Sequence, residues 1–178
     1  VGGVAAGVGF NTVGISGAAP GATLAGIRTG AALNDVDVAS WVGHQQQQID
    51  IYNNSYGPVD PNPNNPIGSS MMTGMGPLTT AAVRNGTTNG RGGLGNIFVW
   101  AGGNGGDFAD NVNYDGYANS RFTVAVGAID HNGVRSPYSE PGASLMVVAP
   151  SNGAPGVGIT TTDLIGTDGY HATDYVDN

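Results

Sequence analysis

Glycine and proline interrupt the apolar stretches of this chain along its whole length, and this pattern limits the possible fold more than any other feature. The 178 residues include 32 glycines and 10 prolines, roughly twice the usual share. No apolar stretch approaches the roughly 20 residues that a membrane-spanning helix needs, which excludes such a span. At 39% hydrophobic residues, however, the chain is too apolar for a disordered polypeptide. We therefore expect one folded domain of short elements joined by tight turns.

Short apolar runs rich in β-branched residues alternate with stretches of helical spacing. The sequence predicts a helix over residues 36–48, with Asn34 or Asp35 as its N-cap, and a second helix over 78–85. It predicts strands over residues 23–27, 49–54, 97–101, 122–129, 145–149 and 158–162. This alternation indicates an α/β fold on a mostly parallel, twisted sheet. A Pro/Asn-rich loop at 58–66 precedes methionines that we expect to fill the core: Met71, Met72 and Met75.

The charge balance narrows the range of partners. The formal net charge is −8, with no lysine and only five scattered arginines, so neither nucleic acid nor an anionic membrane surface is an expected partner. An acidic chain attracts cations or basic substrates, although a merely solvated acidic surface accounts for the same composition. The absence of cysteine excludes disulfides, thiolate metal sites and a cysteine nucleophile.

Several segments, taken in order, resemble subtilisin-like serine proteases, and in particular the kexin and furin branch. They correspond to the stretch after the catalytic His-Gly-Thr, the substrate-binding strand, the oxyanion segment and two later motifs, at residues 1–28, 50–58, 90–106, 113–120 and 137–140. The resemblance implies a three-layer fold with helices on both faces of the sheet. Residues 61–75 and Pro141-Gly142 depart from the family pattern, which favours a bacterial member.

The resemblance also implies roles for individual residues. Asn104 matches the side-chain amide that stabilises the oxyanion, and its glycine neighbours allow close approach of a substrate carbonyl. Asp115 matches the carboxylate that pairs with a basic side chain in the specificity pocket. The residues expected to bind a peptide substrate, partly by main-chain hydrogen bonds, are Ser55, Tyr56, Gly57, Asp60, Ala101, Gly102, Gly103 and Asp115.

Two calcium sites follow from the same comparison. Asp60, Asp110 and Glu140, the only glutamate of the chain, match a calcium site behind the specificity pocket. Carboxylates gathered in space repel one another unless a hard cation binds between them. A second site would use carbonyl and amide oxygens of a loop, and its aspartate ligand would lie before residue 1. The loop residues are Val8, Asn11, Val13 and Ile15.

The catalytic aspartate, histidine and serine of the family fall outside residues 1–178 in this comparison. The resemblance therefore predicts the central part of a single peptidase domain, truncated at both ends and inactive alone, with the rest of that domain as its partner. A central strand between the predicted strands 23–27 and 49–54 would be missing, so we expect that the fragment does not fold alone. The parent would be a secreted, extracellular or periplasmic calcium-dependent endopeptidase cutting after basic residues. A peptide-binding pseudoprotease and a calcium-binding structural domain remain as alternatives.

Overall fold

The structure is a computed structural model that describes residues 1–30, 34–62, 64, 72–153, 157–164 and 166–169. Met71 lies outside these residues. The chain divides into two compact units, one formed by Val1–Gly26 with Ala154–Asn178 and the other by Ile27–Gly153. The larger unit contains the sheet and all of the predicted site residues except the four of the second calcium loop.

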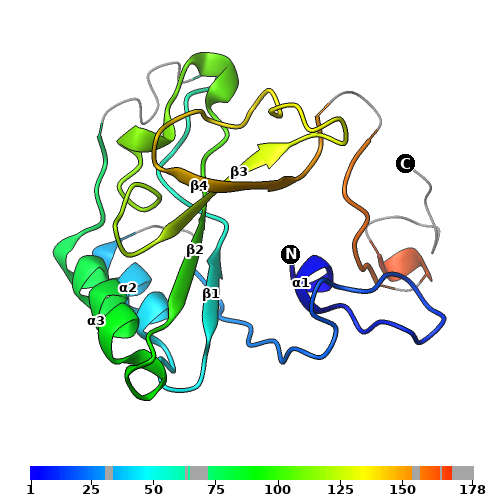
Figure 1. The fold of residues 1–178 in the computed structure, drawn as a ribbon, viewed down its shortest axis with the longest axis horizontal. Coiled ribbons are helices and arrows are strands. Elements are labelled where there is room, and N and C mark those ends of the chain that lie inside the picture. Colours follow the sequence, from blue (N-terminus) through cyan, green and yellow to red (C-terminus); the bar gives the residue numbers. More distant parts are fainter. Residues whose placement is uncertain (31–33, 63, 65–71, 154–156, 165, 170–178) are drawn as a thin grey trace. The chain divides into compact units, whose positions relative to one another are not determined.

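Four parallel strands form the sheet of the larger unit, in the order β1-β2-β3-β4 (Figure 1). They are β1 (Ile51–Asn54), β2 (Ile97–Ala101), β3 (Val124–Ile129) and β4 (Leu145–Pro150). The register pairs Asn54 with Trp100 and Trp100 with Ala125. The predicted α/β class, its parallel sheet and these four strands are confirmed. Because β1 lies at one edge of the described sheet, a further strand beside it stays a prediction.

Two helices cover one face of this sheet (Figure 1). They are α2 (Asp35–Gly43) and α3 (Pro77–Gly93), the latter broken at Gly90–Gly92 by non-helical backbone angles. Val38 and Val42 from α2 and Val83 from α3 pack with the buried side chains of the strands. Those strand side chains alternate along β1 and β2, as period-2 geometry requires: Tyr52, Phe98 and Trp100.

The starts of α2 and α3 are joined by one carboxylate. Asn34 caps α2 through its side chain, which accepts from the Asp37 N–H. Asp35 accepts from the backbone N–H groups of Leu78 and Thr79 at 2.9 and 2.8 Å, so it caps α3 from the neighbouring helix. Burial raises the pKa of Asp35, but these hydrogen bonds outweigh that effect and leave the pKa below its usual value.

The helix α3 extends beyond the predicted end at residue 85, and Gly86 allows it to pack closely there. A Cβ at Gly86 would lie 2.7 Å from Gln46 Nε2 and 2.7 Å from Phe98 Cζ, so only glycine lets the helix pack this closely. The helix α2, in contrast, ends at Gly43 instead of residue 48, and Gln45 follows it in the left-handed region.

Three sequence predictions are wrong. Residues 23–27 and 158–162 form no strands, and Leu24 is 59% exposed. A strand is stable only when a neighbouring strand pairs with its backbone, and no described strand pairs with either segment. Met72 is 81% exposed instead of buried, whereas Met75 packs against the core as predicted.

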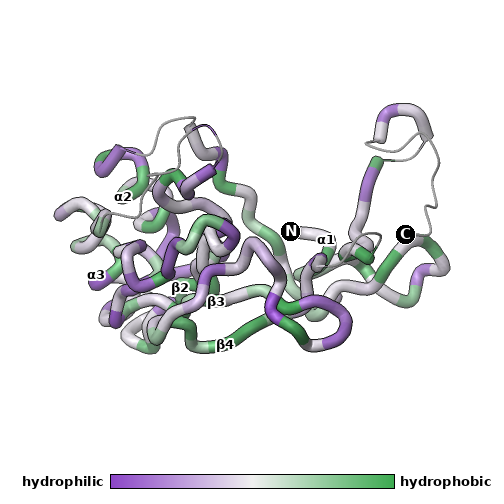
Figure 2. The backbone as a smooth tube through the Cα atoms, turned by 90° about the horizontal axis from the view of Figure 1, so that it is seen from above, coloured by the Kyte–Doolittle hydropathy of each residue, from purple (hydrophilic) through white to green (hydrophobic). Residues whose placement is uncertain are grey.

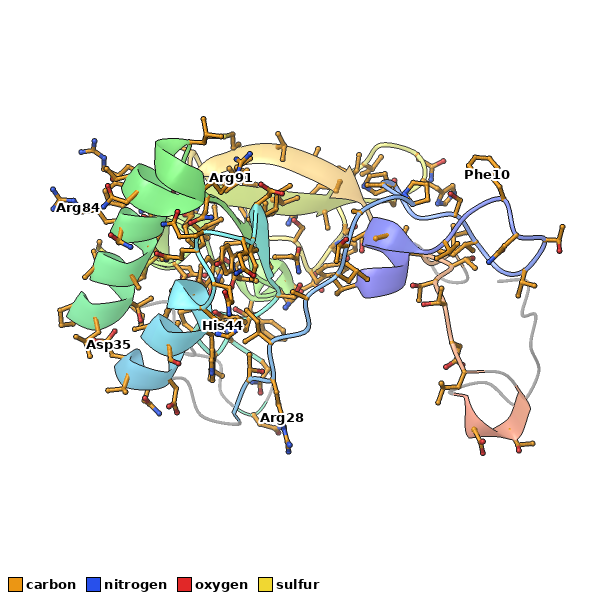
Figure 3. All side chains as sticks on the ribbon, turned by 90° about the horizontal axis from the view of Figure 1, so that it is seen from below. Phe10, Arg28, Asp35, His44, Arg84 and Arg91 are labelled. Atoms are coloured by element: carbon orange, nitrogen blue, oxygen red, sulfur yellow. The ribbon has the colours of Figure 1, made fainter. Side chains whose placement is uncertain are left out.

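In its described residues, the smaller unit contains only a short α-helix and a 3-10 helix (Gly166–Asp168). A single-turn helix, α1 (Gly2–Ala6), precedes a loop whose arms are joined by hydrogen bonds from Gly17 N–H to the Gly7 carbonyl and from Ala18 N–H to the Val4 carbonyl. Phe10 extends from this loop with its side chain fully exposed (Figure 3). In the larger unit, hydrophobic residues follow one another along β4 (Figure 2).

Candidate active site

The predicted peptide-binding segment, Ser55–Gly57, follows β1 directly. In the described part of the chain, no backbone–backbone hydrogen bond involves residues 55–57 outside the strand ladder. Their backbone groups are therefore available to an extended peptide. The Tyr56 carbonyl is the exception, because it accepts a hydrogen bond from the Trp100 indole at 2.6 Å.

Asn104 lies in the loop after β2, three residues beyond Ala101. Its backbone N–H and its side-chain Nδ2 both donate to Asp60 Oδ2, at 2.9 and 3.2 Å. Gly103 before it has a φ of 83°, a conformation that favours glycine. Asn104 is exposed, so its amide is accessible to a substrate, but in this structure it points to a carboxylate.

Asp60, Asp110 and Glu140 come together as predicted. One oxygen from each lies within 4.8 Å of the others, and Asp110 and Glu140 are only 3% and 2% exposed. We call these three residues the acidic cluster. Glu140 accepts from the Gly105 N–H at 3.0 Å, and Asp110 accepts from the Asn111 N–H at 2.8 Å. Among the described residues, the one ion pair joins Arg91 and Asp50, so no arginine neutralises the cluster.

The uncompensated charge of the acidic cluster changes the acidity of Glu140. Burial raises the pKa of Glu140 to about 7, and the charges of Asp110 and Asp60 add to this effect against the lowering contribution of the Gly105 N–H. A buried carboxylate in such surroundings is stabilised either by a proton or by a cation.

Asp115 forms the opposite side of the same region. Its Oδ1 accepts from the Tyr117 N–H at 2.7 Å, while a Cβ added to Gly57 would lie 3.0 Å from its Oδ2. Asp115 therefore faces the backbone of the Ser55–Gly57 segment. Burial raises the pKa of Asp115 to about 6, and Asp60 and Asp110 contribute further. A positively charged side chain entering here would stabilise the ionised form.

The acidic cluster fits a calcium ion by the chemistry of its donors. All three groups offer carboxylate oxygens, which hard cations such as calcium prefer, and no nitrogen or sulfur ligand competes. Two of the three side chains are buried, in contrast to an ordinary solvated acidic surface. The predicted second calcium loop lies in the smaller unit, where Val8, Asn11 and Val13 are exposed and the Asn11 amide oxygen already accepts from the Val13 N–H.

Sequence reasoning missed two contributors to this region. Trp100 was predicted only as part of a strand, yet its indole N–H reaches the peptide-binding segment. Thr73 pairs with Asp115 in an isolated parallel bridge, and Gly116 donates to the Thr73 carbonyl at 2.7 Å. The apolar run at 97–101 indicates burial of Trp100 but carries no signal for its hydrogen-bond partner.

The parallel four-stranded sheet and the helices packed on it define an α/β domain. A model of the subtilase family matches residues 1–175, and the chain belongs to this family.

Curated relatives come from the convertase branch. The chain is 42% identical to human proprotein convertase subtilisin/kexin type 4 over 88% of this chain and 20% of that protein. It is 38% identical to furin-like protease 2 of Drosophila melanogaster over 93% of this chain and 10% of that protein. It is also 38% identical to bovine neuroendocrine convertase 2, over 84% of this chain and 23% of that protein. The chain thus spans less than a quarter of the length of these relatives.

Solved structures agree with the fold. A serine protease of Aeromonas sobria, crystallised with a chaperone, aligns with a TM-score of 0.72 at 25% identity, over 97% of this chain and 32% of that one. A protease of Pseudoalteromonas arctica aligns with a TM-score of 0.68 at 22% identity, over 85% of this chain and 42% of that one. Both support the predicted subtilisin-like α/β class. Within the described ranges, no helix combines the length and apolar character needed to cross a membrane.

Proposed function

We propose that this chain forms the substrate cleft of a calcium-dependent subtilisin-like serine endopeptidase that cleaves peptide bonds after basic residues. The observation that carries this proposal is Asp115. Its carboxylate is largely buried beside Gly57, and its pKa is raised to about 6 because burial and the neighbouring acids disfavour its charge. An arginine or lysine side chain of the substrate would supply the missing positive charge.

The proposed reaction is attack by a serine assisted by histidine and aspartate, residues that the family resemblance places outside 1–178. Asn104 would donate its amide N–H to the oxyanion that forms on the substrate carbonyl. One N–H of its Nδ2 already donates to Asp60 at 3.2 Å, so the second N–H of the same amide would be the donor to the oxyanion. Ser55 and Gly57 would hold the substrate main chain, while Ala101, Gly102 and Gly103 would line the approach to Asn104.

Calcium held by Asp60, Asp110 and Glu140 would neutralise the charge that these side chains place behind the pocket. The residues of the second loop, Val8, Asn11, Val13 and Ile15, are proposed as ligands of a second calcium. The proposed partners are a peptide or protein substrate and the remaining parts of the peptidase domain. The proposed location is secreted, extracellular or periplasmic, as the family resemblance implies.

The test compares two peptides that differ only at the residue before the cut, arginine in one and leucine in the other, with the full-length protein. We expect a higher kcat/KM for arginine, and a large loss of that preference in Asp115→Asn. Asp107→Asn removes an exposed acid outside the cluster and should keep the preference. Equal kcat/KM for both peptides in the unaltered protein would refute the basic-residue specificity.

A second candidate is a non-catalytic protein, either a peptide-binding pseudoprotease or a calcium-binding structural domain. The two hydrogen bonds from Asn104 to Asp60 favour it, because the backbone N–H and one N–H of the amide are both engaged by the acidic cluster and a single amide N–H is left for an oxyanion. The full-length protein would then bind calcium, and in the first case peptides, without turnover of any basic-site peptide. Calorimetry with a substrate peptide shows whether the protein binds peptides, and a cleavage assay shows whether it hydrolyses them. Together they distinguish an active peptidase, a pseudoprotease and a structural domain.

A further inference from the structure

We propose that Trp100 is a positioning residue that sets the distance between the two walls of the substrate cleft, the Ser55–Gly57 segment and the Asp115 loop. This inference rests on the proposed function and adds a specificity-determining residue to it. Trp100 itself contacts no substrate in this proposal. It acts through the backbone of Tyr56 and through the ring of Tyr117.

The first wall is held by a hydrogen bond. The Trp100 indole Nε1–H donates to the Tyr56 carbonyl at 2.6 Å. In the part of the chain that the structure describes, this is the single hydrogen bond to the backbone of residues 55–57 beyond the strand ladder. The Tyr56 side chain also anchors this segment, since it packs against Trp41 and donates to Asn54 Oδ1. The indole adds the contact to the main chain itself, and so sets where the free backbone groups of the segment meet a peptide.

The second wall is held by ring packing. The Trp100 ring lies 5.3 Å from the Tyr117 ring at an interplanar angle of 33°. The backbone N–H of Tyr117 in turn donates to Asp115 Oδ1 at 2.7 Å, so the position of Tyr117 fixes that of the pocket carboxylate. One side chain thus contacts both walls.

The indole has no freedom to move. Trp100 is 0% exposed, and its backbone is paired on both sides, with Asn54 of β1 and Ala125 of β3. The Tyr56 ring meets the Trp100 ring at 5.3 Å and 75°, an edge-to-face contact. A rigid donor on a central strand is a more accurate support than a second loop would be.

An ordinary core role for Trp100 makes a different prediction, and Phe98 provides the comparison. Phe98 lies two residues earlier on the same face of β2, is 1% exposed and stacks on Tyr52 at 4.9 Å. Its side chain carries no hydrogen-bonding group and so makes no hydrogen bond to the Ser55–Gly57 segment. Truncating either ring weakens the core, but only Trp100 should alter how peptides bind.

The experiment uses the full-length protein and compares Trp100→Phe with Phe98→Leu. Replacing Trp100 by benzothienylalanine provides a second variant that keeps the ring shape and removes only the N–H. The concentration of active sites is measured with a covalent serine reagent. KM and kcat are then determined for a peptide with six residues before the cut and for a short substrate with a single basic residue.

For both Trp100 variants we expect KM for the long peptide to rise about tenfold, the effect of one lost hydrogen bond. We expect kcat per active site to stay within about twofold and KM for the short substrate to rise less than KM for the long peptide, because a short substrate makes fewer main-chain contacts with residues 55–57. Phe98→Leu should lower the melting temperature and leave the ratio of the two KM values unchanged.

Hydrogen exchange gives a readout independent of catalysis. Amides of residues 55–57 should exchange faster in the benzothienylalanine variant than in the unaltered protein, with β2 still protected. Unchanged exchange there and an unchanged long-peptide KM would overturn the role of Trp100. If the unaltered protein cleaves neither substrate, the proposed function fails, while the exchange comparison and calorimetry with the long peptide still decide this inference.

Discussion

Removing one charge from the acidic cluster should stabilise the metal-free protein. Glu140→Gln keeps the size of the side chain and an oxygen that accepts from the Gly105 N–H. It removes a charge that is 2% exposed and lies beside Asp110 and Asp60. Because no arginine pairs with these groups in the described residues, the variant loses repulsion and no ion pair.

The magnitude follows from the pKa of Glu140, which is raised from 4.5 to about 7. Each unit corresponds to roughly 1.4 kcal/mol, so ionising Glu140 in the fold costs about 3 kcal/mol. Below pH 4.5 the side chain is protonated in both the folded and unfolded states, and the wild type carries no penalty. The penalty grows as the pH rises from 4.5 to about 7 and is complete above that range.

The assay is thermal unfolding of the full-length protein in a chelator, between pH 5 and 8.5. At pH 8 we expect Glu140→Gln to melt roughly 6–12 °C above the wild type, and at pH 5 close to it. Calcium should close or reverse the difference, because it binds the wild-type cluster and stabilises by mass action. Asp107→Asn, an exposed acid, is the matched control. A melting temperature for Glu140→Gln that does not exceed that of the wild type at pH 8 in chelator would refute the reasoning.

Three further outcomes can be measured on the same protein. Gly76→Ala should lower the free energy of unfolding, measured in urea, by about 1–3 kcal/mol, because the new Cβ would collide with the Asp35 carboxylate that caps α3. Gly74→Ala is the control and should be near neutral, because nothing lies within 4 Å of the added Cβ. Gly105→Ala should weaken calcium affinity, measured by calorimetry, about tenfold or more, because the new Cβ would lie 2.7 Å from Asp110 Cβ. An unchanged affinity would count against the acidic cluster as the calcium site. Asn104→Ala should lower kcat about 10²–10³-fold with little change in KM, and a loss confined to KM would show that Asn104 binds the ground state instead of the oxyanion.

The sequence predicted those elements whose signal is local. The apolar run Ile97–Ala101 matches β2 residue for residue, and Asn34 caps α2 as its residue type suggests. The strand predictions at 23–27 and 158–162 failed because an apolar run reports burial or pairing potential, whereas a strand also needs a partner. The length of α3 could not be predicted, since Gly86 lowers helix propensity and is required only by close packing against Gln46 and Phe98.

The site was predictable to the extent that a family resemblance supplied it. Asp60, Asp110 and Glu140 are far apart in the sequence, and no periodicity places them together, yet the structure brings them within 4.8 Å. The roles of Asn104 and Asp115 stay predictions. The Trp100 to Tyr56 hydrogen bond joins residues 44 positions apart and ends on a backbone carbonyl, an acceptor that every residue carries. Nothing in the residue types distinguishes that carbonyl from its neighbours.

The sheet's register also bears on the order in which the chain folds. Ile51 of β1 pairs with Ile97, whereas Ala125 of β3 pairs with Leu145, so the second pairing closes a loop less than half as long. Each doubling of loop length adds about 0.6 kcal/mol to the entropy cost of closure. Loop closure alone therefore favours early pairing of β3 with β4 and late addition of β1. The Ser55–Gly57 segment, which follows β1, would then be among the last parts of the larger unit to reach its place.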